Sequence, residues 1–288
     1  MRGWRGLAAL AAAMAMGCLA FAPAWADDAS ANQMWKSLAN ALFPHQALTE
    51  DGTIIKLGTP LAADNGALVP VTLHMNYTDP GLPADDPRRV KKITLVIDNN
   101  PAPVAAVFEL GPKADVTKIE TRVRVNQNTR VHAVAETMDG KFYVSESFVA
   151  AAGGCSSASG DSAGYDGPPV GTIRLRAIKP EYVSNDSQRK EAVVMIKHPN
   201  NTGMQMDQET HLYIPARYIE TLRVTQGDDL IFAVTGGISI SEDPNFRFDY
   251  VLERRERHVG HGRRYEGREI RQGRRARARD VKRCAAAN

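Results

Sequence analysis

Short runs in which apolar and polar residues alternate constrain the fold of this 288-residue chain more than any other feature. Alternation places every second side chain on one face, as in a half-buried strand. Turn-forming sequences such as Asp64-Asn65-Gly66 and Met138-Asp139-Gly140 separate the runs. Seven such runs lie in the first half, at Ile54–Leu57, Leu68–Asn76, Val90–Asp98, Val104–Leu110, Ile119–Val125, Val131–Glu136 and Phe142–Val149. They predict an antiparallel β-sandwich within residues 27–150.

A second series of runs predicts another small β-sandwich, over residues 170–252. Its five runs are Thr172–Ile178, Ala192–Lys197, Tyr218–Thr225, Leu230–Thr235 and Phe246–Leu252. Ahead of both series, apolar residues recur at helical spacing in residues 31–43, which predicts a short amphipathic helix. The expected fold class is therefore all-β, with two antiparallel sandwiches and one short N-terminal helix.

Residues 151–169 interrupt the strand pattern. Fifteen of these 19 residues are Ala, Gly, Ser or Pro, so the segment has few side chains to bury. Such a composition is typical of flexible linkers. We therefore expect a mobile connection between the two sandwiches.

The first 26 residues have the three parts of a secretory signal. Arg2 and Arg5 precede the uncharged run Leu7–Phe21, and Ala24-Trp25-Ala26 follows it as a small-residue cleavage site. We expect cleavage after Ala26 and export to an oxidising compartment. A lipoprotein anchored at Cys18 is the alternative. A run of 15 residues is short for a membrane-spanning helix, so stable membrane insertion is not expected.

The charge of the chain is divided unevenly. Residues 253–288 contain 13 Lys and Arg against five Asp and Glu, whereas the rest of the chain is acidic. The net charge of +3 therefore does not indicate a nucleic-acid-binding protein. The arginine-rich tail has almost no large aliphatic residues, which predicts disorder. A frameshift would explain this composition, and a basic arm for acidic partners or membranes is the alternative.

Cys155 is the most informative single residue. It follows Gly153 and Gly154 inside the predicted linker, where few side chains would crowd its sulfur. A nucleophilic sulfur on a reachable arm is what a covalent carrier requires. We expect Gly153 and Gly154 to make this arm flexible, and the linker itself contains no positive charge beside the thiol. The alternatives are an incidental linker cysteine and an intermolecular disulfide.

Several stretches resemble two sulfur-oxidation families. In the first half they are Gly66-Ala67-Leu68-Val69-Pro70-Val71, Ile97-Asp98-Asn99-Asn100-Pro101-Ala102-Pro103, Thr121-Arg122-Val123-Arg124-Val125 and Gly153-Gly154-Cys155, which resemble SoxY. In the second half they are His198-Pro199-Asn200-Asn201-Thr202-Gly203, Ile214-Pro215-Ala216-Arg217-Tyr218-Ile219 and Ser239-Ile240-Ser241-Glu242-Asp243-Pro244-Asn245-Phe246, which resemble SoxZ. The order of the motifs is similar to that of the fused SoxYZ-like carriers associated with quinoprotein (PQQ-dependent) dehydrogenases.

This resemblance implies two immunoglobulin-like sandwiches and a periplasmic carrier that turns nothing over itself. Cys155 would hold a sulfur intermediate covalently, as in thiosulfate oxidation. The implied partners are periplasmic redox enzymes: a c-type cytochrome enzyme that loads the cysteine, a hydrolase that unloads it, or a quinoprotein dehydrogenase. The arm departs from the SoxY pattern, because Ser156 and Ser157 follow the cysteine and the chain continues into the second half.

No motif for a catalytic site, cofactor or metal is expected elsewhere. His258 and His261 lie in the arginine-rich tail, where nothing would supply further ligands. His198 is interpreted as structural, and Met204-Gln205-Met206 as a partly buried turn. Two other functional classes stay open: a structural module cross-linked through Cys155, and a binding module that assists a dehydrogenase.

Overall fold

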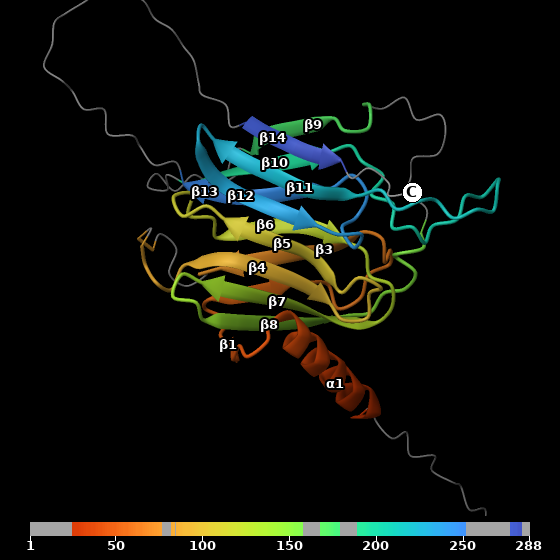
Figure 1. Cartoon of the computed structure of the whole chain (residues 1–288), viewed down its shortest axis with the longest axis horizontal. Helices are drawn as coiled ribbons and strands as arrows, with labels where there is room; N and C mark the ends of the chain where they lie inside the picture. The colour runs from red at the N-terminus through yellow and green to blue at the C-terminus, as the bar shows by residue number, and fades with distance from the viewer. Residues whose placement is uncertain are drawn as a thin grey trace, which may run out of the picture.

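Strands dominate a computed structural model of the chain (Figure 1). The structure describes residues 25–76, 82–83, 85–157, 168–178, 189–251 and 277–283. The helix α1 (Trp25–Leu42) begins six residues before the predicted segment and lies beside β1 and β8 at one end of the molecule. Within the described residues, no helix is both long enough and apolar enough to cross a bilayer. The predicted leader lies mostly outside these residues.

Every predicted strand is confirmed by an observed strand that overlaps it. The strands of the first half are β1 (Leu48–Glu50), β2 (Ile55–Gly58), β3 (Val69–Met75), β4 (Val90–Ile97), β5 (Val104–Leu110), β6 (Lys118–Val123), β7 (Thr129–Thr137) and β8 (Phe142–Val149). Those that follow are β9 (Ile173–Ile178), β10 (Arg189–Ile196), β11 (Ile219–Gln226), β12 (Asp229–Gly236), β13 (Asn245–Val251) and β14 (Arg277–Arg283). The alternation is visible in β3, where Val69, Val71, Leu73 and Met75 are buried.

The two halves form immunoglobulin-like sandwiches that share their sheets. One sheet has eight strands in the order β1-β8-β7-β4-β5-β12-β11-β14, and the other has six, in the order β2-β3-β6-β13-β10-β9. All strand pairs are antiparallel except β1 with β8. The halves join where β5 pairs with β12 and β6 pairs with β13 (Figure 1). Edges that would otherwise be unpaired are thus covered by the other half.

One hydrophobic core runs through both halves. Phe232 and Phe248 of the second half are fully buried, with ring centroids 4.8 Å apart. Phe246 lies between them and Phe108 of the first half, with centroids 6.2 Å from Phe108 and 6.4 Å from Phe232. The junction is therefore packed like the inside of a domain rather than like a surface contact.

Polar contacts reinforce this junction at the β6–β13 side. The carboxylate of Asp249 accepts the backbone N–H groups of Thr117 (2.7 Å) and Lys118 (2.8 Å). Lys118 Nζ donates to Glu191 Oε1 over 3.1 Å, and Arg189 forms an ion pair with Asp115. Each of these contacts links the first half to the second, so the halves are held in one arrangement.

The prediction that the arginine-rich tail is disordered is wrong for residues 277–283. These residues form β14, which pairs with the outer edge of β11 (Figure 1). Backbone groups make the ladder, so a strand can form there although the side chains are mostly basic. The remainder of the tail lies outside the described residues, as do Cys284, His258 and His261, and the frameshift stays a prediction.

Candidate functional site: a buried cysteine between the two halves

Cys155 lies within residues 151–157, a stretch that follows β8 and that we call the cysteine segment. Its side chain is 0% exposed. The predicted accessible thiol on a mobile arm is therefore wrong for this conformation. Sequence composition misled here, because small residues fit tightly against backbone as readily as they make flexible linkers.

Backbone hydrogen bonds hold the cysteine segment in place. The N–H of Gly153 donates to the carbonyl oxygen of Asn126 (2.8 Å), and that of Gly154 donates to the carbonyl oxygen of Val125 (3.0 Å). Both acceptors belong to the stretch that follows β6. The segment is thus docked on the first half by main-chain contacts, which do not depend on large side chains.

The two glycines have different structural roles, neither of which is flexibility in the docked state. Gly153 has a φ of +68°, a conformation that residues with a β-carbon rarely adopt. At Gly154 a β-carbon would lie 2.0 Å from the carbonyl oxygen of Gly66 and 2.5 Å from that of Val125. Gly154 is therefore required for close approach of three backbone segments. That Gly153 and Gly154 also act as flexible joints of the arm stays a prediction.

The second half covers Cys155 through the loop that follows β10. Thr202 Oγ1 donates to the carbonyl oxygen of Cys155 over 2.6 Å. Thr202 is itself fixed, because its N–H donates to Gln205 Oε1 (2.7 Å). Buried His198 supports the same loop by accepting the N–H of Asn200 (3.0 Å), in keeping with the structural role expected for it. Both halves of the chain therefore enclose the cysteine.

Arg124, which lies outside the predicted linker, supplies a positive charge next to Cys155. Its side chain is 0% exposed, and Nη1 donates to the carbonyl oxygens of Gly154 (3.0 Å) and Ser157 (3.4 Å). These two carbonyls flank Cys155 in the chain. Burial lowers the pKa of the Arg124 guanidinium, while the negative charges of Glu242 and, to a smaller extent, of an ionised Cys155 act in the opposite direction.

Three buried N–H-bearing atoms around this point have no hydrogen-bond partner among the described residues. They are Nε and Nη2 of Arg124 and Nε2 of Gln205. Buried polar groups are almost always paired, because an unpaired buried donor costs roughly 1–3 kcal/mol. Unused donors from both halves therefore lie around the cysteine segment.

Burial raises the pKa of the Cys155 thiol, and Arg124 partly opposes this effect. We expect alkylation of Cys155 by iodoacetamide to increase with pH along a curve whose midpoint lies above the usual value for a thiol. Because the folded-state pKa of Cys155 is raised, the neutral buried thiol makes its full contribution to the free energy of unfolding at pH values below the unfolded-state pKa. This contribution is lost as the pH rises through the folded-state pKa. Mass-spectrometric alkylation rates measured from about pH 7 to pH 10 test this; a midpoint at or below that of a free thiol would contradict it.

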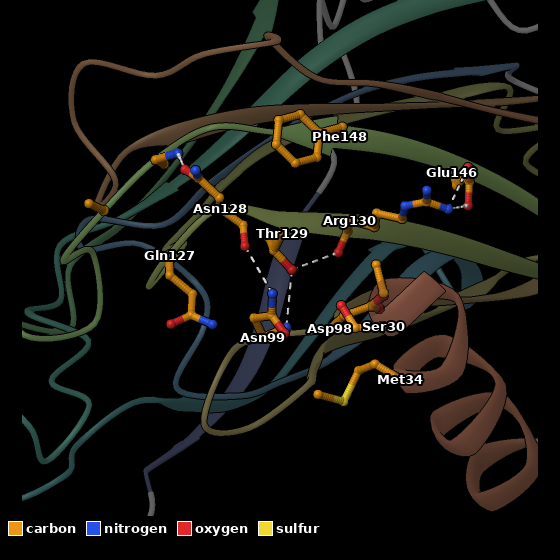
Figure 2. Close-up of a pocket in the computed structure, with 13 residues that line it drawn as sticks. Ser30, Met34, Asp98, Asn99, Gln127, Asn128, Thr129, Arg130, Glu146 and Phe148 are labelled. Atoms are coloured by element: carbon orange, nitrogen blue, oxygen red, sulfur yellow. Dashed lines mark hydrogen bonds and ion pairs between the residues drawn. The ribbon is translucent and has the colours of Figure 1, made fainter. Parts of the chain in front are cut away.

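A cavity of about 860 Å³ lies beside the start of the cysteine segment. Figure 2 shows Ser30 and Met34 of α1 on one side of it, opposite Phe148 of β8. Ala151 and Ala152 of the segment also line this space. Any movement of the segment would therefore change the cavity wall.

The helix α1 is fixed beside this cavity through one buried histidine. The ring of Trp35 stacks on His132 at a centroid distance of 3.6 Å. His132 is fully buried, with Nδ1 3.0 Å from Asp98 Oδ1 and Nε2 3.2 Å from Glu146 Oε2. Its ring nitrogens are thus engaged in structural contacts.

Sequence models of two protein families match the chain. The model of "Sulfur oxidation protein SoxY" matches residues 39–155, and that of "Sulphur oxidation protein SoxZ" matches residues 178–259. The chain is a fused SoxYZ-like protein. The SoxY match ends at Cys155, and the SoxZ match contains the loop that covers it.

Two further comparisons accompany this assignment. The solved structure titled "Structure of the sulfur carrier protein SoxY from Chlorobium limicola f thiosulfatophilum" is similar at 22% identity and a TM-score of 0.35. The match covers 44% of this SoxYZ-like chain and 99% of the SoxY chain. No curated protein matches the chain significantly.

Sequence reasoning identified Cys155 but missed the residues that surround it. Arg124 and Thr202 lie in stretches that resemble SoxY and SoxZ, yet nothing in their local pattern indicates proximity to the cysteine. Gln205 was placed in a partly buried turn, whereas its side chain is fully buried. Within the described residues, no group of three or more His, Cys, Asp or Glu side chains could hold a metal ion.

Proposed function

We propose that this SoxYZ-like protein carries a small sulfur intermediate covalently on Cys155 and presents it to partner enzymes without turnover of its own. The observation that carries the proposal is the position of Cys155, a thiol enclosed between a SoxY and a SoxZ domain beside the buried charge of Arg124. Among the described residues Cys155 is the sole cysteine.

The loading chemistry that fits this site is oxidative coupling. The Cys155 thiol and thiosulfate, S₂O₃²⁻, would join through a new S–S bond to give Cys–S–S–SO₃⁻. This step releases one proton and two electrons, and a partner redox enzyme such as a c-type cytochrome would accept the electrons. Hydrolysis of the bond between the outer sulfur and the sulfonate by a second enzyme would then consume one water, release sulfate and a proton, and leave the persulfide Cys–S–SH. A cargo supplied by a quinoprotein-dehydrogenase pathway would use the same thiol.

Cys155 must leave its buried position to reach another enzyme. The hydrogen bonds from Gly153 and Gly154 to the strand end, and the one from Thr202 to Cys155, would break in this movement. Bonds within the segment, such as those from Ser156 and Ser157 to the Gly153 carbonyl, can persist. We propose that the segment swings out as a short preformed turn in the periplasm, after removal of the leader.

Intact mass spectrometry on protein purified from the periplasm without reductant tests this function. We expect wild-type protein from cells grown on thiosulfate to carry a mass excess that reductant removes, and Cys155→Ser protein to carry none. The mass also reports leader removal. A wild-type protein that is unmodified on thiosulfate and on dehydrogenase substrates would contradict the carrier function. A dimer linked only through Cys155 would support the cross-linked structural module instead.

A further inference from the structure

The environment of Cys155 contains more hydrogen-bond donors than the free thiol uses. Arg124 places Nη1 on the carbonyls of Gly154 and Ser157, which leaves Nε and Nη2 without partners. Gln205 keeps a third unused donor, Nε2, while its oxygen accepts from Thr202. Because Thr202 also donates to the Cys155 carbonyl, the Gln205 amide is connected to the cysteine backbone through Thr202 by two hydrogen bonds.

From this geometry we infer that Arg124, assisted by Gln205, forms a binding site for the terminal sulfonate of a sulfur intermediate attached to Cys155. A sulfonate is an anion with three acceptor oxygens, so it matches a buried guanidinium with free N–H groups. Charge-assisted hydrogen bonds are stronger than neutral ones, and burial strengthens them further. The docked segment would then be the storage state of the loaded carrier. This inference rests on the proposed function.

The chemical consequence is that the anionic conjugate docks more firmly than a neutral one. With a bare thiol at Cys155, the three donor atoms Nε and Nη2 of Arg124 and Nε2 of Gln205 stay unpaired. A neutral group of similar size on the sulfur would leave them unpaired as well. A sulfonate on Cys155 would pair them and would bring a negative charge next to Arg124. Loading with an anion should therefore shift the cysteine segment toward its buried position, and loss of the sulfonate should release it.

The test uses conjugates made by small reagents, so it does not depend on any partner enzyme. In a background with Cys18 and Cys284 changed to serine, Cys155 is labelled in urea and the protein is returned to buffer. Tetrathionate gives Cys–S–S–SO₃⁻ and releases thiosulfate and a proton. Methyl methanethiosulfonate gives the neutral Cys–S–S–CH₃ and releases methanesulfinate. Dithiothreitol then supplies two electrons to cleave either conjugate, and the cleavage rate in urea divided by that in buffer measures protection.

We expect protection of the sulfonate conjugate to exceed that of the methyl conjugate by about tenfold in the wild type, as one charge-assisted contact implies. Arg124→Gln should abolish this difference, and Arg124→Lys should restore most of it because the charge returns. The exposed Arg223 provides the matched control, since Arg223→Gln removes the same charge elsewhere. If Arg124→Gln does not refold, Gln205→Leu should still reduce the difference severalfold.

Equal protection of the two conjugates in the wild type would overturn the inference, as would an Arg124→Gln variant that keeps the difference. If Arg124→Gln changed the cleavage rates of the sulfonate and methyl conjugates by the same factor, Arg124 would have a structural role only. This result would also overturn the inference. The proposed function fails separately, if protein from cells never carries an adduct. A loaded carrier with equal protection of both conjugates would leave the function standing and remove the sulfonate site.

Discussion

Gly154→Ala will expose the Cys155 thiol in a protein whose sheets remain folded. The added β-carbon would lie 2.0 Å from the carbonyl oxygen of Gly66, and backbone atoms cannot move aside as a flexible side chain can. Overpacking of this kind costs up to roughly 3 kcal/mol. Since about 1.4 kcal/mol corresponds to a factor of ten, the thiol should react on the order of 100-fold faster. Reaction with Ellman's reagent under native conditions measures this rate.

Two other glycines provide graded controls for that experiment. Gly153→Ala places its β-carbon in open space but at a φ of +68°, which costs about 1–2 kcal/mol. It should therefore increase thiol reactivity by roughly tenfold. Gly52→Ala meets no atom within 4 Å at an ordinary φ and should change nothing. An unchanged rate in Gly154→Ala, with an unchanged far-UV spectrum, would show that the docked segment is not what hides the thiol.

Phe232→Ala will lower the free energy of unfolding of the whole chain by about 3–5 kcal/mol, the range for truncating a fully buried aromatic side chain. Phe232 is 0% exposed and packs against Phe248 and Phe246, and its strand pairs with β5 of the SoxY domain. Because the core is continuous, the loss should destabilise both domains together. Urea denaturation followed by fluorescence and by far-UV circular dichroism should give one coincident transition at a lower midpoint.

Phe148→Ala is the matched control for this substitution. Phe148 is 46% exposed on β8, so its truncation removes the same ring without opening a buried cavity. We expect a change within about 0.5 kcal/mol for such a surface site. Two separate transitions in Phe232→Ala, one with the wild-type midpoint, would show that the domains unfold independently and would contradict the shared core.

The strands were predictable from sequence because alternation is a local signal. In β3 every second residue is apolar and faces the core, so the burial pattern can be read from neighbouring residues. The pairing of β5 with β12 was not predictable in the same way. Which edges meet depends on backbone groups that every residue carries, and the two strands lie more than 100 residues apart.

The cysteine was found from sequence, but its environment was not. A Gly-Gly-Cys sequence among small residues is compatible with a mobile arm and with tight backbone packing, and only the positions of Gly66 and Val125 decide between them. Arg124 directly follows a strand whose pattern gives no hint of a ligand, and its role depends on contacts with residues 30 positions away. Long-range contacts of this kind do not produce a periodic pattern of apolar and polar residues in the sequence.

The edge-to-edge junction has a consequence for how the site around Cys155 is assembled. Thr202 and Gln205 come from the SoxZ domain and Arg124 from the SoxY domain, so the complete environment exists only when the two domains are together. In one polypeptide this encounter is intramolecular, with an effective concentration that for short tethers reaches the millimolar range. Dilution therefore cannot separate the parts, and their stoichiometry is fixed at synthesis. The site should be equally complete in a dilute compartment and in a concentrated solution.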